Sequence, residues 1–154
     1  MGVEKLVTEM LEKEGHLIKD VLCDSWEELV DILAVPLLNE GAVEPRFVES
    51  AKEAVREFGG YMVLIDDIAF FHGKPEEGVR EIALTLAFLK NPVYLSEKRI
   101  TVAFLLAAID NVSHRGLLKE LSQFMNDEEC LELLRKGEDI DVIMEKFKEI
   151  EERA

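Results

Sequence analysis

An unbroken apolar run, ITVAFLLAAI, occupies residues 100–109 and constrains the fold more than any other stretch of the sequence. Its β-branched and aromatic residues favour a strand, and it is much shorter than the roughly 18 apolar residues that cross a membrane as a helix. A strand with apolar side chains in both directions must be covered on both faces. The run therefore predicts a buried strand in a sheet that has helices on each side.

The first third of the chain shows helical spacing. Apolar residues from Val3 to Leu11 recur at this spacing and Gly15 ends the pattern, which predicts a first helix. A second helix begins at the capping box SWEE, residues 25–28, and Pro36 is expected to kink or split it. A third begins at Pro45, because proline suits the first turn of a helix.

Short apolar segments replace the helical spacing in the middle of the chain. The stretch YMVLIDDIAFF, residues 61–71, predicts two brief strands with a turn at Asp66 and Asp67. Residues 82–88 alternate in the manner of another strand, and Asn91-Pro92 is expected to turn the chain before the buried run.

The last third of the sequence predicts three helices. One covers residues 114–125, the next begins after Asp127, which is expected to cap it, and the last lies beyond Gly137. No repeat or Gly/Ser/Pro-rich linker divides the sequence. We therefore expect a single α/β domain over residues 1–154, in which a small mixed β-sheet is sandwiched between helices on both faces.

The composition restricts the partners. With 33 acidic and 18 basic residues the formal net charge is −15, which disfavours nucleic acid and anionic membrane surfaces and favours protein partners. The N-terminus lacks the basic and apolar regions of an export signal, so a cytoplasmic protein without membrane insertion is expected. Cys23 and Cys130 stand alone, without the spacing of a zinc site, and no cofactor is expected.

Two of the three histidines follow predicted strands. His72 comes after IAFF, and His114 comes after the buried run, where Ser113 is expected to cap a helix. Ligands and anions collect at strand ends and helix N-termini, because backbone N–H groups and the helix dipole point there. The remaining histidine, His16, is expected to be exposed at a helix end.

An imidazole has a pKa of about 6.5 and is largely neutral at cytoplasmic pH, so it can attack an electrophilic phosphoryl group. A second imidazole could orient the first or donate to phosphoryl oxygens. The spacing leaves two alternatives open. His72 and His114 could be packed side chains without a reactive role, or they could form a metal site with a carboxylate such as Asp110.

Three stretches together resemble a known family. They are DSWEELVDILAVPLLNEGAVEPRFVESA, GGYMVLIDDIAFFHGKPEEGV and AAIDNVSHRGLLKEL, and they stand in the order found in type-2 EIIA domains of the bacterial phosphoenolpyruvate-dependent sugar phosphotransferase system. The likeness extends over nearly the whole chain and is strongest to the ascorbate-type branch. The resemblance implies the mannitol/fructose-type EIIA fold.

The resemblance also implies roles for individual residues. His72 stands at the histidine that accepts a phosphoryl group from the carrier HPr and passes it to a cysteine of EIIB. His114 stands at a second pocket histidine, while Asp110 and Ser113 match flanking positions and Lys74 is a candidate for binding the phosphoryl group. HPr, a cognate EIIB and, indirectly, the membrane component EIIC are the implied partners, and a homodimer is open.

The chain departs from the ascorbate-type pattern around the reactive position. Phe71 replaces a proline, Gly73 an alanine and Lys74 an arginine, so this loop has a freer backbone and lacks the planar fork suited to phosphate. The related mannitol/fructose branch carries an arginine in the preceding helix, to which Arg56 is not clearly equivalent.

Two functions follow from the resemblance. The first is a phosphocarrier for a sugar such as ascorbate or a related compound. The alternative is a regulatory EIIA-like protein that binds another protein according to its phosphorylation state, and the altered FFHGK segment motivates it.

Overall fold

A four-stranded mixed sheet forms the centre of the molecule, for which a computed structural model describes residues 7–153. The strand order is β1-β3-β4-β2. β1 runs parallel to β3, β2 parallel to β4, and the two central strands are antiparallel to each other. The strands are β1 (Leu17–Val21), β2 (Asp67–His72), β3 (Ala83–Leu95) and β4 (Lys98–Ala107).

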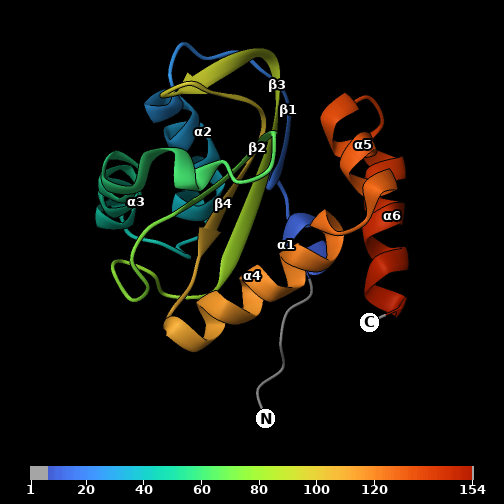
Figure 1. Ribbon diagram of the computed structural model, residues 1–154. Coiled ribbons are helices and arrows are strands. Elements are labelled where there is room, and N and C mark those ends of the chain that lie inside the picture. Colours follow the sequence, from blue (N-terminus) through green and yellow to red (C-terminus); the bar gives the residue numbers. More distant parts are fainter. Residues whose placement is uncertain (1–6, 154) are drawn as a thin grey trace.

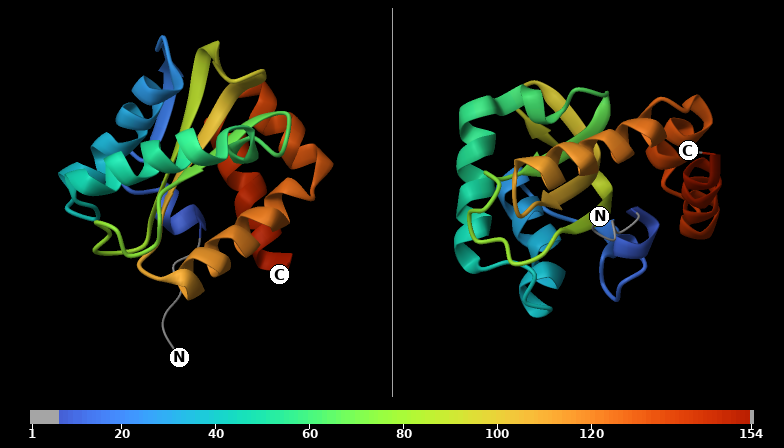
Figure 2. Two further views of the ribbon diagram at one scale, coloured as in Figure 1. Left: turned by 60° about the vertical axis from the view of Figure 1, so that its left-hand side comes forward. Right: turned by 90° about the horizontal axis from the view of Figure 1, so that it is seen from below.

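Helices cover both faces of this sheet (Figures 1 and 2). One layer consists of α2 (Trp26–Asn39) and α3 (Pro45–Phe58), which the 3₁₀ helix η1 (Gly59–Met62) extends. The other consists of α1 (Val7–Leu11), α4 (Asn111–Met125), α5 (Glu128–Lys136) and α6 (Ile140–Arg153). The predicted α/β class, with a mixed sheet between helical layers, is confirmed.

The apolar run forms β4 and supplies both cores, as expected from its composition. Alternate side chains point in opposite directions along a strand. Ala103 and Leu105 therefore join the core beneath α2 and α3, while Phe104 and Leu106 join the core beneath α4, α5 and α6. All four are at most 1% exposed, and burying each large side chain contributes roughly 1.5–3 kcal/mol.

Two predictions for the middle of the chain are wrong. Residues 61–71 do not form two strands, because η1 takes up the front of the segment and a single strand begins at Asp67. The predicted turn at Asp66 and Asp67 is present: the Ile68 N–H donates to the Ile65 carbonyl at 3.0 Å, and the φ of Asp67 is +74°. Asn91-Pro92 lies within β3, where the pairing with β4 shifts between Phe88 and Val93. Such an irregularity accommodates a proline, which cannot donate to a ladder. The hairpin turns instead near Ser96, at φ +56°.

The N-terminal predictions also needed correction. α2 continues through Pro36 to Asn39 without splitting. The described part of the first helix ends at Leu11, and residues 3–6 lie outside the described part of the chain. A short parallel edge strand, β1, follows this helix and was not predicted. Its five residues show no clear alternation of apolar and polar side chains, because two polar residues, Lys19 and Asp20, stand next to each other.

Candidate functional site

The reactive candidate, His72, is the last residue of β2 and pairs with Leu106 of the central strand β4. The alternation of the strand places it on the same face as Phe70, whose ring stacks on Phe104 at 5.3 Å between centroids. The neighbouring Phe71 points the other way and is completely buried. His72 therefore lies at the end of a strand whose two preceding residues, Phe70 and Phe71, pack on opposite faces of the sheet, and it is half-buried.

A single hydrogen bond sets the tautomer of His72. Its Nδ1 lies 2.9 Å from the carbonyl oxygen of Phe70. Since a carbonyl oxygen only accepts hydrogen bonds, Nδ1 carries the proton, and in the neutral ring Nε2 carries the lone pair. Burial lowers the pKa of His72 from its ordinary value, against the smaller opposing effect of the Phe70 carbonyl. The ring is thus neutral at physiological pH, with Nε2 as its basic atom.

The second histidine comes from the first turn of α4, as the sequence predicted. The rings of His72 and His114 stand with centroids 5.0 Å apart and planes inclined by 51°. Burial lowers the pKa of His114, and the positive charge that His72 would carry lowers it further. The antiparallel and parallel pairing of the sheet thus brings together two imidazoles that are separated by a long stretch of sequence.

The start of α4 differs in one detail from the prediction. Asp110, not Ser113, is the N-cap: its carboxylate accepts from the Ser113 amide at 2.7 Å, and the Ser113 side chain accepts from the Asp110 amide at 3.2 Å. The hydrogen bond from the Ser113 amide holds the pKa of the Asp110 carboxyl below its usual range, and the Ser113 hydroxyl makes a smaller contribution in the same direction. Both residues therefore fix the helix start from which His114 projects.

The metal alternative finds no support in this arrangement. Within residues 7–153, no group of three or more His, Cys, Asp and Glu side chains is placed to hold a metal ion. The carboxylate of Asp110, which was named as an example of a third ligand, is engaged in the cap of α4.

The contacts of Lys74 and Arg56 are with residues other than the two histidines. Lys74 has an exposed side chain, and its backbone N–H donates to Ser50 Oγ at 3.2 Å, so any role of its ammonium group toward phosphate stays a prediction. Arg56 lies over the ring of Trp26, 5.8 Å from the centroid, in a cation–π contact between α3 and the start of α2. The structure thus assigns Arg56 a packing contact.

An apolar groove of about 500 Å³ adjoins His72, and sequence reasoning missed it. Tyr61 and Leu64 at its rim are each 76% exposed, which is unusual for large apolar side chains. The prediction of two strands over residues 61–71 did not distinguish buried from exposed side chains, so the exposure of Tyr61 and Leu64 was not foreseen. The lining consists of Tyr61, Leu64, Ile65, Phe70, His72, Leu118, Leu121, Ser122, Met125 and Asn126.

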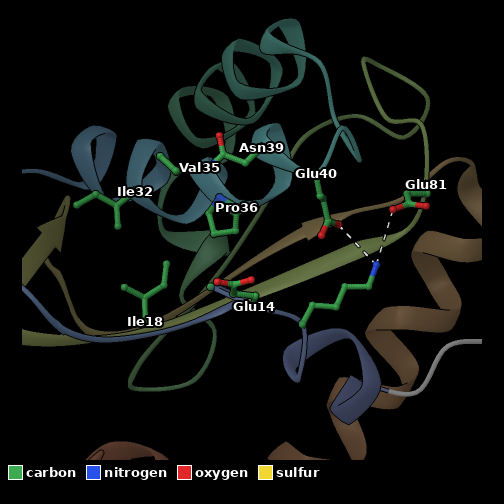
Figure 3. Close-up of a pocket in the computed structure, with 10 residues that line it drawn as sticks. Glu14, Ile18, Ile32, Val35, Pro36, Asn39, Glu40 and Glu81 are labelled. Atoms are coloured by element: carbon green, nitrogen blue, oxygen red, sulfur yellow. Dashed lines mark ion pairs between the residues drawn. The ribbon is translucent and has the colours of Figure 1, made fainter.

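A second cavity, of about 900 Å³, lies beside α2 and does not include the histidine pair (Figure 3). Lys13 bridges the carboxylates of Glu40 and Glu81 across it, at 3.7 Å each. Glu40 also contacts His16, which is completely buried. The prediction that His16 is exposed at a helix end is therefore wrong. Its nitrogens lie 2.9 Å from Glu40 and 2.9 Å from the Leu84 carbonyl, which makes it a structural link between α2 and β3.

None of the helices formed by residues 7–153 has the length and apolar character needed to cross a bilayer.

Comparison with known proteins places this geometry in context. The ascorbate-specific PTS system EIIA component of Escherichia coli K12 is 30% identical over 116 residues, which cover 73% of this chain and 75% of the relative. The mannitol-specific cryptic phosphotransferase enzyme IIA of Escherichia coli superposes with a TM-score of 0.76 at 25% identity, covering 92% of this chain and 95% of that one. The complex of enzyme IIAMTL and phosphorylated enzyme IIBMTL from Escherichia coli matches with a TM-score of 0.76 at 19% identity, covering 88% and 95%.

A family match extends over nearly the whole chain. Residues 9–150 match the family described as "Phosphoenolpyruvate-dependent sugar phosphotransferase system, EIIA 2". The mixed sheet, its two helical layers and the likeness to solved enzyme IIA structures agree with that match. The chain belongs to the EIIA type-2 family of the phosphoenolpyruvate-dependent sugar phosphotransferase system.

Proposed function

We propose that this protein is a cytoplasmic phosphocarrier, in which Nε2 of His72 accepts a phosphoryl group from phospho-HPr and passes it to a cysteine of a cognate EIIB. The observation that carries the proposal is the hydrogen bond from His72 Nδ1 to the Phe70 carbonyl, 2.9 Å long. It leaves Nε2 with the lone pair of a neutral ring, which is the electronic state that a nucleophile needs.

The reaction then proceeds in two displacements. The Nε2 lone pair attacks the phosphorus atom in line, a P–N bond to His72 forms, and the bond between phosphorus and HPr breaks with its electron pair returning to HPr. In the second step a thiolate of EIIB attacks the same phosphorus, and the electron pair of the P–N bond returns to Nε2. His72 consumes no net proton: Nδ1 keeps its proton throughout and donates it in the hydrogen bond to the Phe70 carbonyl.

His114 and the start of α4 supply electrostatic support. The ring of His114 lies 5.0 Å from that of His72 between centroids. When neutral, it can donate one N–H to a phosphoryl oxygen and places no positive charge beside His72. The first turn of α4 adds the positive end of a helix dipole, which favours the negative charge of the phosphoryl group. Asp110 and Ser113 contribute by fixing that turn.

The apolar groove beside His72 is the expected contact surface for both protein partners. Exposed Tyr61 and Leu64 offer apolar area at the edge of the acceptor, and protein interfaces favour such residues at their centre. The complex between a structurally similar enzyme IIA and phosphorylated enzyme IIB supports EIIB as a partner. The likeness to an ascorbate-specific component makes ascorbate, or a related sugar, the first transport substrate to test.

Reconstitution tests the proposal. The protein is incubated with labelled phosphoenolpyruvate, enzyme I and HPr, and then with an ascorbate-type EIIB. We expect acid-labile label on the wild type, none on His72→Gln, and slower labelling of His114→Gln. A wild-type chain that stays unlabelled, while a known EIIA in the same mixture is labelled, would contradict it.

The regulatory alternative gains nothing from the structure. It was motivated by Phe71, Gly73 and Lys74, yet Phe71 is completely buried and Gly73 is buried as well. Only Lys74 of the three presents a side chain to a partner. A pull-down with phosphorylated and unphosphorylated protein tests this alternative, and a phosphorylation-dependent partner other than EIIB would support it.

A further inference from the structure

The chain directly after His72 is fastened to helix α3 through Ser50. The backbone N–H of Lys74 donates to Ser50 Oγ at 3.2 Å, and Ser50 itself is 6% exposed. Ser50 lies in the middle of α3, where a serine contributes little to helix stability and its side chain is free to bond outside the helix. Its hydroxyl therefore reaches from one layer of the fold to the segment that follows the proposed phosphoryl acceptor.

Gly73 fits against the same side chain. A Cβ atom on Gly73 would stand 2.9 Å from Ser50 Oγ, closer than real Cβ atoms come to a neighbour, and 3.1 Å from the backbone nitrogen of Ala51, which is tighter than most real contacts. The close approach is what allows the next amide, that of Lys74, to reach the hydroxyl. Ser50 and Gly73 are thus a matched pair, because the hydroxyl occupies the space that any larger residue at position 73 would need.

The rest of the loop links this contact to the second histidine. The N–H of Glu76 donates to the Ala108 carbonyl at 3.3 Å, and Ala108 immediately precedes the segment that caps α4. The Gly78 carbonyl accepts from the Glu44 N–H at 2.7 Å, at the start of α3. The loop therefore connects α3, the end of β2 with His72 and the start of α4 with His114.

We propose that Ser50 is a positioning residue for phosphoryl transfer, whose hydroxyl clamps the Gly73-Lys74 segment to α3 and thereby sets the orientation of His72 relative to His114. Since no proline lies between Pro45 and Pro75, the backbone at His72 has no rigid ring to restrain it, and the hydroxyl supplies that restraint. The inference rests on the proposed function of His72, but its effect on the imidazole can be measured without any transfer.

The first test is Ser50→Ala, studied by NMR titration of the histidine nitrogens and of the Lys74 amide. Loss of the clamp admits water to His72, so its pKa rises toward the ordinary value, and the Lys74 amide loses its hydrogen bond. Phosphorylation by HPr should slow on the order of tenfold, because a misplacement of about 1 Å can cost about a hundredfold and the loss of one hydrogen bond should displace His72 by less than that. His72 signals and a transfer rate equal to those of the wild type would overturn the proposal.

Thr85→Val is the matched control. Thr85 also uses a buried hydroxyl, which donates to the Leu33 carbonyl at 2.8 Å, but it lies on β3, with β4 between it and β2. Its loss should lower stability and leave the His72 titration unchanged, so an equal shift in both variants would also overturn the proposal. If the wild type accepts no phosphate, the proposed function fails, while the titration of Ser50→Ala still decides whether the clamp exists.

Gly73→Ala supplies an independent variant. In the wild-type background its methyl group meets Ser50 Oγ, so we expect the same His72 signature as in Ser50→Ala. In the Ser50→Ala background the 2.9 Å contact is gone, and the looser contacts with the Ala51 nitrogen at 3.1 Å and the Cβ atom of residue 50 at 3.3 Å remain, so adding Gly73→Ala should then cost less. Equal effects of Gly73→Ala in the two backgrounds would contradict a matched pair.

Discussion

The rings of His72 and His114 stand 5.0 Å apart between centroids, and each ring makes protonation of the other less favourable. Burial lowers the pKa of both rings, and the charge on His72 lowers that of His114 further. The pair therefore favours two neutral rings at neutral pH. One of them has its free lone pair on Nε2, because Nδ1 is bound to the Phe70 carbonyl.

The pH dependence of phosphoryl transfer follows from these lowered pKa values. Because protonation removes the Nε2 lone pair, the rate of labelling from phospho-HPr should fall to half of its plateau only below about pH 6.5, the pKa of an ordinary histidine. Rates at a series of pH values, with HPr phosphorylation checked separately, measure this. A half-maximal rate at or above about pH 6.5 contradicts a lowered His72 pKa.

Removing the charge of one ring should change the pKa of the other. In His72→Gln the repulsion that lowers the pKa of His114 disappears, so the pKa of His114 should rise while burial still keeps it below the ordinary value. NMR titration of the remaining histidines checks the direction. An unchanged pKa would show that the two rings do not interact in solution.

The docking groove predicts a separation of kinetic constants. Leu64→Ser removes an exposed apolar contact at the groove rim without touching His72, so KM for phospho-HPr should rise about fivefold, as expected for roughly 1 kcal/mol of interface energy, while kcat stays unchanged. Tyr94→Ser is the control, since Tyr94 is 58% exposed on the β3–β4 hairpin. Equal KM changes in both variants would exclude the groove as the docking surface.

The cap of α4 distinguishes a structural role for Asp110 from a chemical one. Asparagine also accepts the Ser113 amide, so Asp110→Asn should keep the melting temperature and most of the transfer rate, whereas Asp110→Ala should lower the melting temperature and slow transfer through His114. Thermal melts and labelling assays of both variants measure this. Loss of transfer in Asp110→Asn, with stability intact, would instead give the carboxylate a direct role.

His16 should matter for stability alone. His16→Ala leaves a cavity and removes a partner of the Leu84 carbonyl and one of the two partners of Glu40, so the free energy of unfolding should fall by about 3 kcal/mol. The exposed neighbour Glu14 offers a control, because Glu14→Ala should change it by less than about 0.5 kcal/mol. Urea titrations of the two variants make the comparison, and a stable His16→Ala protein would contradict the structural role.

The elements that the sequence predicts well are those whose own residues determine them. The β4 run is apolar on both sides, and Asp127 accepts from the Cys130 amide at 2.9 Å as a local cap, so both predictions are confirmed. The strand β1 depends on its pairing with β3, and the burial of His16 depends on its contacts with Leu84 and Glu40. No local pattern reveals these distant partners. His16 looked like an exposed helix end because it follows Gly15, and a histidine near a helix C-terminus interacts favourably with the helix dipole.

The site divides in the same way. The pairing of His72 with His114 follows from strand ends that the sequence indicates, and the structure brings the two together. The contact between Ser50 and the Gly73-Lys74 segment joins the middle of a helix to a loop, so it has no sequence signature. The groove was missed because residues 61–71 were read as two strands, and that pattern did not indicate that Tyr61 and Leu64 are exposed.

The most direct test of the account is the position of the phosphoryl group, read by two-dimensional NMR of the ¹⁵N-histidine-labelled protein after incubation with phosphoenolpyruvate, enzyme I and HPr. The hydrogen bond from Nδ1 to the Phe70 carbonyl predicts phosphorus coupled to Nε2 of His72, with His114 unmodified. Phosphate on Nδ1 of His72, or on His114 while His72 stays free, would contradict the account.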